Sequence, residues 1–275
     1  MPTARRCTHP DRRTGASLPS APVLALATLL VAAMPTYRAL AATPTSDDEA
    51  AVWLERLEEL DRRAPLRVRC LVQARLQQPG GELRSTIGMD LLYGGSGRMR
   101  SEAEVDLEAA GLGSVELRAL VVSDGRVVWV ETENAESRPQ VAKTTADRLD
   151  EISLAGGLPG MGAGLGGLDP FRQVFELASL MQLEVEQRAA GGGVVLAGVP
   201  SVEFEDRLGA TAALFAGGMR LELRRDGLPL RMRLGDPERP ALDVRFEDYE
   251  LLDDGALPGD AFAYSPPAGV TVQQR

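Results

Sequence analysis

The residues that carry most enzyme chemistry are scarce in this chain. The only histidine is His9, and the two cysteines are Cys7 and Cys70. His9 and Cys7 lie in an N-terminal segment that we expect to be cleaved, which leaves no imidazole and one thiol. Such a composition excludes a Ser-His-Asp triad, a Cys-His dyad, a histidine-ligated zinc or iron site and an internal disulfide. We therefore expect no catalytic residues, no metal and no cofactor.

Carboxylates are the other group with catalytic potential. The chain has 40 acidic and 30 basic residues, and its net charge is -10. Paired carboxylates can hydrolyse glycosides, and a chain this acidic always allows some pair at a suitable separation. Glu102, Glu104 and Asp106 alternate with apolar residues, which is typical of the solvated face of a strand. A glycoside hydrolase therefore ranks third among the functions considered below, because no particular pair of carboxylates stands out in the sequence. The negative net charge argues against a nucleic-acid partner.

Glycines crowd residues 155–168, after a stretch at 141–154 that has the pattern of a helix. A phosphate-binding loop needs a strand before it and a lysine at its end, but the only lysine is Lys143, which lies upstream. We therefore interpret 155–168 as a flap that carries apolar side chains such as Met161.

Residues 1–41 have the parts of an export signal. Four arginines precede an apolar run at 23–34, and Ala39, Leu40 and Ala41 follow in the order of a cleavage site. The apolar run is too short for a membrane-spanning helix, which takes roughly 20 residues. We expect a periplasmic protein without a membrane anchor, whose mature chain folds as a single domain over 42–275.

Two amphipathic helices are predicted, one near the start of the mature chain and one after the Gly-rich segment. The first covers about 46–63 and places Trp53, Leu57 and Leu60 on one stripe. The second opens at Asp169 and Pro170 and presents Phe171 and Phe175. A helix of this kind is more often a lid over a core than a partner-binding element, so these side chains and Met161 are predicted lid residues.

From Leu66 onward the apolar period changes from about 3.6 residues to 2. Alternating runs lie at about 66–77, 83–93, 98–107, 115–122, 126–132, 183–187, 194–199, 219–224, 230–234 and 242–246, with turn residues such as Gly-Gly-Ser-Gly and Asp-Gly between several of them. Charged side chains take one side of the runs throughout. The pattern predicts an α+β fold with about 9–11 short-looped, mostly antiparallel strands and two or three helices.

Several short motifs, in this order, resemble the outer-membrane lipoprotein carrier (LolA-like) family of periplasmic proteins. They are Gly97-Arg98-Met99-Arg100, the hairpin Ser123 to Trp129, Asp169-Pro170-Phe171, Gly227-Leu228-Pro229-Leu230 and the closing string Phe262-Ala-Tyr-Ser-Pro-Pro-Ala-Gly-Val-Thr-Val272. Together the motifs cover most of the chain after residue 42. Ser96 stands where the family usually has proline, and the Gly-rich segment resembles an insertion.

The resemblance implies a curved antiparallel sheet that forms an incomplete, half-open β-barrel, with lid helices over an apolar cavity for lipid acyl chains. The candidates for the cavity wall are Val68, Cys70, Val72, Ile87, Met89, Leu91, Met99, Val105, Leu117, Val121, Trp129, Met219, Leu221 and Leu223. For each of these residues, plain core packing is the alternative to ligand contact.

The function implied is a non-enzymatic, monomeric carrier whose partners are a lipid or lipoprotein cargo and membrane proteins that donate or accept it. A second alternative has the same fold but another role: a sensor module that binds a partner protein, as the LolA-like domains of periplasmic stress regulators do. Those regulators carry a further domain, for which this sequence gives no sign.

Overall fold

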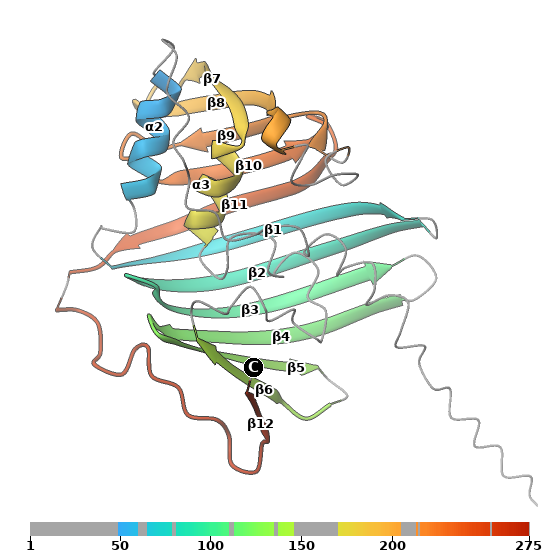
Figure 1. The fold of residues 1–275 in the computed structure, drawn as a ribbon, viewed down its shortest axis with the longest axis vertical. Coiled ribbons are helices and arrows are strands. Elements are labelled where there is room, and N and C mark those ends of the chain that lie inside the picture. Colours follow the sequence, from blue (N-terminus) through green and yellow to red (C-terminus); the bar gives the residue numbers. More distant parts are fainter. Residues whose placement is uncertain are drawn as a thin grey trace, which may run out of the picture.

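The computed structural model describes residues 49–59, 65–78, 81–109, 113–134, 137–145, 170–204, 213, 215–253 and 255–274. These ranges include the helices α2 (Glu49–Glu58) and α3 (Pro170–Ser179) (Figure 1). They also hold β1 (Leu66–Gln78), β2 (Gly81–Gly95), β3 (Arg98–Ala109), β4 (Gly113–Asp124), β5 (Val127–Asn134), β6 (Gln140–Thr145), β7 (Met181–Arg188), β8 (Val194–Pro200), β9 (Met219–Leu223), β10 (Pro229–Gly235), β11 (Pro240–Leu251) and β12 (Val272–Gln274). The predicted export signal at 1–41 and flap at 155–168 lie outside the described residues.

All of these strands belong to one sheet, in the order β12-β6-β5-β4-β3-β2-β1-β11-β10-β9-β8-β7. Neighbours pair antiparallel, except that β12 pairs parallel with β6. β7 and β12 lie at opposite ends of this order, so the sheet curves without closing on itself (Figure 1). The predicted fold class, an α+β fold with a half-open antiparallel barrel, is confirmed, with 12 strands in place of about 9–11.

The prediction of a helix over 141–154 is wrong for its first residues. They form β6, in which Val141 pairs with Glu131 and Thr145 with Val127 of β5. Val141, Thr144 and Thr145 are β-branched, and such side chains fit the pleated surface of a strand better than a helix. Residues 146–154 lie outside the described part of the chain.

The hairpin between β2 and β3 explains the departure from the family's proline. Gly95 pairs with Arg98, so Ser96 and Gly97 are the two turn residues, with φ angles of 53° and 73°. Two positive φ angles define the type I′ turn, whose twist suits a two-residue hairpin. Proline cannot adopt a positive φ, so this turn excludes it at residue 96.

The two described helices lie over the β7–β11 part of the sheet (Figure 1). α2 packs against α3 and β7, and α3 also contacts β7. The Phe171 ring stacks on Phe246 of β11 at 5.6 Å and meets Tyr93 of β2 edge-on at 5.7 Å. α3 therefore connects the two parts of the sheet that flank β1.

Residues 255–274, called here the C-terminal strap, follow β11 in the chain and end in β12 (Figure 1). The Phe262 ring lies against Gly94 at the end of β2, and the Arg98 guanidinium lies 5.7 Å from its centroid. Arg98 also donates a hydrogen bond to the Gly94 carbonyl at 2.6 Å. The strap is thereby attached to the β2–β3 hairpin.

A second attachment of the strap joins it to β5. The rings of Tyr264 and Trp129 lie 5.3 Å apart, and the Tyr264 hydroxyl donates to the Glu131 carboxylate at 2.5 Å. Burial and this carboxylate raise the pKa of Tyr264 above its ordinary value. The closing motif thus packs against both earlier motifs, Gly97 to Arg100 and Ser123 to Trp129.

An ion-pair network orders the outer face of β10 and β11. The Asp243 side chain, which is 7% exposed, accepts two hydrogen bonds from Arg231, at 2.9 and 2.7 Å, and one from Arg245 at 3.2 Å. Burial would raise the pKa of Asp243, but the hydrogen bonds from Arg231 and Arg245 outweigh it and hold the pKa below its ordinary value. Asp243 is therefore a stabilising carboxylate in its ionised form.

Gly94→Ala tests the attachment of the strap. A β-carbon at residue 94 would lie 2.5 Å from the Phe262 ring, whereas one at Gly88 of the same strand would have no atom within 4 Å. We expect Gly94→Ala to lower the free energy of unfolding by about 1–2 kcal/mol, and Gly88→Ala to leave it unchanged or slightly raised. Urea denaturation of both variants measures this. Equal stability of the two would show that the strap does not need this close approach.

Asp243→Asn tests the ion-pair network. We expect a loss of about 2 kcal/mol of unfolding free energy at pH 7, because charge-assisted hydrogen bonds from two arginines are weakened. A carboxylate with a lowered folded pKa stabilises above the unfolded pKa of about 3.9, and this stability is lost as the pH falls further. The deficit of the variant should therefore shrink below about pH 4.

The control for Asp243→Asn is Glu104→Gln. Glu104 lies 3.8 Å from Arg118, with both side chains more than three-quarters exposed at 79% and 77%. Such a pair contributes little, so the change should stay within about 0.5 kcal/mol. An Asp243 deficit that is independent of pH would contradict the assigned role of its charge.

Candidate functional site

The face of the sheet that packs against α3 is called here the inner face, and strand register determines its members. Cys70 lies opposite Met89 in the β1–β2 pair, and Ile87 lies opposite Val105 in the β2–β3 pair. By the same pairing, the inner face carries Val68, Cys70, Val72, Ile87, Met89, Leu91, Met99, Val105, Leu117, Val121, Met219, Leu221 and Leu223. These are all of the predicted wall residues except Trp129.

Trp129 lies on the outer face, and its prediction as a wall residue is wrong. It pairs with Val122 and Lys143, and the Lys143 ammonium lies 4.9 Å from its ring centroid. Residues 127–130 are all apolar, so their alternation does not show which of them point inward. The pairing of Val130 with Val121 decides this, and it turns Trp129 toward the strap.

The predicted lid residues that the structure describes are largely buried. Trp53 and Leu57 of α2 are 8% and 2% exposed, and Phe171 of α3 is 4% exposed. Phe175 packs, partly buried, against the same core. Leu60 and Met161 lie outside the described residues.

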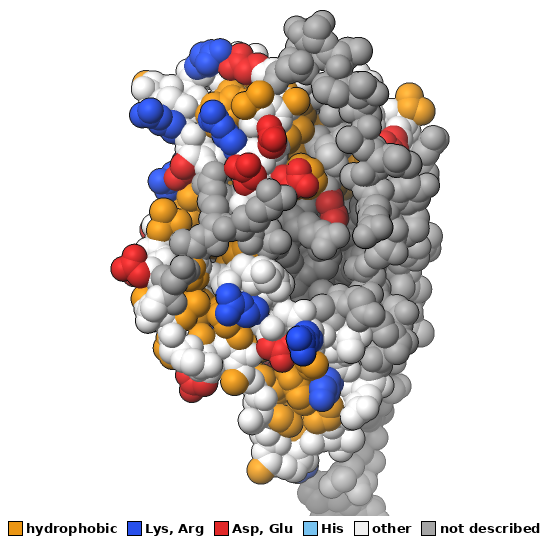
Figure 2. Space-filling model, turned by 60° about the vertical axis from the view of Figure 1, so that its left-hand side comes forward, with side chains coloured by type: hydrophobic (Ala, Val, Ile, Leu, Met, Phe, Trp, Pro, Cys, Tyr) orange, Lys and Arg blue, Asp and Glu red, His pale blue; other side chains and the backbone are white. Residues whose placement is uncertain are grey.

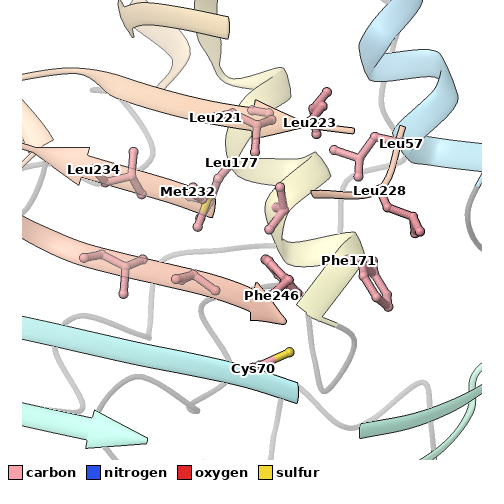
Figure 3. Close-up of a cluster of buried hydrophobic side chains, with 14 of the residues drawn as sticks. Leu57, Cys70, Phe171, Leu177, Leu221, Leu223, Leu228, Met232, Leu234 and Phe246 are labelled. Carbon is pink, nitrogen blue, oxygen red and sulfur yellow. The ribbon is translucent and has the colours of Figure 1, made fainter. Parts of the chain in front are cut away.

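The inner face differs between its two halves. Beneath α3 it carries large side chains: Figure 3 shows Leu177 among Leu221, Met232 and Phe246, with Cys70 of β1 beside them. Leu221, Met232 and Phe246 are at most 2% exposed. This half is a packed hydrophobic core, in which residues of α2 and α3 supply the opposite layer.

The half formed by β3–β6 carries smaller side chains. Ala103 of β3 lies directly opposite Ala119 of β4, and Ala142 of β6 lies opposite Val130 of β5. Ala103 and Ala119 are 4% and 5% exposed. This part of the wall therefore carries smaller side chains than the half beneath α3, although Ala103 and Ala119 belong to the same buried cluster.

Buried hydroxyls also lie on this face, and the sequence analysis did not single them out. Ser85, Ser101, Ser123 and Thr144 are all at most 4% exposed. The Ser123 hydroxyl oxygen accepts a hydrogen bond from the Gly125 amide at 3.2 Å. The hydroxyl oxygens of Ser85 and Ser101 have no hydrogen-bond partner in the described structure. Serine at an inward position of an alternating strand, as in Met99-Arg-Ser101-Glu-Ala103, is the signal that would have identified them.

Along β1–β6, charged side chains are confined to the outer face of the sheet. The described inward positions of β1–β6 carry no charged side chain, whereas Arg100, Glu102 and Glu104 alternate with them on the outside. Figure 2, which brings the left-hand side of Figure 1 forward, shows acidic and basic side chains interspersed with apolar ones on the surface.

Burial, with a smaller effect from Asp90, raises the pKa of the Cys70 thiol to about 12.

An open pocket of about 570 Å³ lies elsewhere, at the turns that join β7 to β8 and β9 to β10. It is lined by Ala189, Gly191, Gly193, Leu223, Arg224, Arg225, Asp226 and Leu230. Arg224 is paired with Asp226 at 3.1 Å and lies 5.6 Å from the Tyr249 ring centroid. Of the two arginines in the lining, Arg224 is therefore already paired within the protein.

Neither a metal-binding cluster nor a membrane-spanning helix is found among the described residues. No cluster of three or more His, Cys, Asp or Glu side chains in these ranges is arranged to hold a metal ion. Neither α2 nor α3 has the length and apolar character of a membrane-spanning helix.

Comparison with known proteins finds likeness at the level of structure. No protein-family profile and no curated protein sequence matches this chain. Among solved structures, LprF from Mycobacterium bovis is 12% identical with a TM-score of 0.44, over 78% of this chain and 99% of that one. A DUF1329 family protein from Desulfovibrio piger is 10% identical with a TM-score of 0.33, over 80% and 98%.

A LolA superfamily protein from Nitrosomonas europaea is 15% identical, with a TM-score of 0.26 over 78% of this chain and 97% of that one. It bears the name of the family whose motifs the sequence resembles. Because these TM-scores are below 0.5, the fold described above rests on this chain's own strand order.

The reactivity of Cys70 tests whether the inner face at β1 is dry. At pH 8 a thiol with a pKa of about 12 is ionised in about one molecule in ten thousand. In a Cys7→Ser variant, we expect a charged disulfide reagent to leave Cys70 unmodified in the native protein and to modify it promptly in denaturant. Complete modification of the native protein within minutes would show that water reaches this part of the face.

Proposed function

We propose that this chain is a periplasmic carrier that holds lipid acyl chains, or the acyl chains of a lipoprotein, against the inner face of its half-open sheet. One observation carries the proposal: an inner face without charge across β1–β6, on a sheet that does not close. Each CH₂ group moved out of water gains about 0.8 kcal/mol, so an acyl chain of roughly 16 carbons gains on the order of 10 kcal/mol before the costs of binding.

The proposed mechanism is passive exchange. Under α3 the packed half of the core holds the sheet in shape, and the half with small side chains provides the wall for the cargo. No nucleotide or covalent step is needed, because transfer follows the relative affinities of donor, carrier and acceptor. The partners are then the lipid or lipoprotein cargo and membrane proteins that deliver and receive it, with the chain acting as a monomer.

The outward position of the acidic residues supports a role without catalysis. Glu102, Glu104 and Asp106 are exposed on the outer face of β3. Their spacing of two residues follows from the strand alternation that also keeps charge off the inner face. These carboxylates therefore serve solubility rather than a substrate site.

Ala119→Leu tests the proposed cargo wall, and Arg118→Leu is its control. The two residues are neighbours on β4 that point to opposite faces, with Ala119 5% exposed and the Arg118 side chain 77% exposed. We expect Ala119→Leu to weaken the binding of a fluorescent fatty acid at least about tenfold, because the larger side chain takes the space of the cargo. Arg118→Leu should bind as the wild type does.

Stability measurements separate a cargo wall from a packed core. If the space above Ala119 is available to cargo, Ala119→Leu should change the unfolding free energy by less than about 1 kcal/mol, whereas overpacking a filled core costs about 1–3 kcal/mol. A variant that is strongly destabilised, together with a wild type that binds no fatty acid, would overturn the proposed function.

A further inference from the structure

Ser101 is a buried polar group that lacks a partner. It is 1% exposed, and its hydroxyl oxygen has no hydrogen-bond partner among the described residues. Burying an unpaired hydroxyl costs free energy, and such groups are few in native proteins. Alanine occupies the next inward position of the same strand, at Ala103. An apolar side chain thus suits this face, and the hydroxyl at residue 101 calls for a partner.

The neighbours of Ser101 do not supply that partner. It lies opposite Leu91 on β2 and Val121 on β4, which are 0% and 1% exposed. Next to it, Ala103 and Ala119 face each other across the β3–β4 pair. The hydroxyl therefore lies beside the smallest side chains of the wall.

The charge of the surroundings selects the kind of acceptor. The described inward positions of β1–β6 carry no lysine or arginine, so a carboxylate or phosphate placed here would be buried without a counter-ion. A neutral carbonyl has no such cost and accepts a hydrogen bond from a serine hydroxyl. An ether-linked lipid has the same hydrocarbon tails as the corresponding ester but lacks this carbonyl.

We propose that Ser101 donates a hydrogen bond to the ester carbonyl of an uncharged acyl ester bound on the inner face beside Ala103 and Ala119. This inference rests on the proposed lipid-carrier function and names the chemical class of the cargo. The acyl tail extends along the apolar wall, and Ser101 fixes the depth at which the ester group lies. The carrier thereby prefers esterified lipids to their ether analogues.

The test compares a fluorescent diacylglycerol with the dialkyl ether that has the same chains and label. The wild type should bind the ester about five- to tenfold more tightly, as expected for one net hydrogen bond. Ser101→Ala should reduce ester binding to the level of the ether and leave ether binding unchanged. Its stability should be equal to or greater than that of the wild type, since an unpaired hydroxyl is removed.

Ser101→Thr and Ser85→Ala are the matched variants. Ser101→Thr keeps the donor and should keep the ester preference. Ser85 is also buried without a partner, but it pairs with Ala74 and Leu107, six residues of β2 away from Leu91, or about 20 Å. Ser85→Ala should therefore keep the preference as well.

The outcomes separate this inference from the proposed function. Failure of the wild type to bind either lipid would overturn the carrier function and the inference with it. Equal binding of ester and ether, or loss of the preference in both alanine variants or in neither, would overturn the role of Ser101 and leave the carrier function standing.

Discussion

The structure depends on the alternation of side chains across strands that pair in register. Because successive residues of a strand point to opposite faces, a slip of one residue would bring Arg100, Glu102 and Glu104 onto the inner face. Cys70, which pairs with Met89 on one side and with Phe246 on the other, helps to prevent this because all three side chains are buried. The separation of charge from apolar surface thus follows from register, and it gives the sheet one apolar face and one charged face.

The motifs that resemble the carrier family hold this sheet together from outside. Arg98, Phe262 and Gly94 attach the strap to one hairpin, and Trp129 and Tyr264 attach it to β5. None of these side chains lies on the inner face. The resemblance therefore describes how an unclosed sheet is stabilised, whereas the cargo preference that we propose depends on inward residues such as Ser101 and Ala119 that the motifs do not include.

The sequence predicted the sheet well where polar and apolar residues alternate. Val68, Cys70 and Val72 could be assigned to one face because arginines flank them, and the Asp169-Pro170 helix start follows from local chemistry. Trp129 was misplaced because its neighbours are all apolar, so only pairing with β4 fixes its direction. β12 could not be foreseen, because its parallel partner β6 lies more than a hundred residues earlier. The lack of a partner for Ser101 is likewise a property of packing, which the residue type alone does not show.

The proposed carrier function assigns different roles to two parts of the half-open sheet. In that proposal, the large side chains beneath α3 supply the core, and the small ones of β3–β6 provide the wall for acyl chains. Native mass spectrometry of the protein purified from a host with an outer membrane tests this most directly. We expect a noncovalent adduct with the mass of a lipid or lipidated polypeptide, released at moderate collision energy. A protein that carries no adduct and takes up no fluorescent fatty acid afterwards would contradict the proposed carrier function.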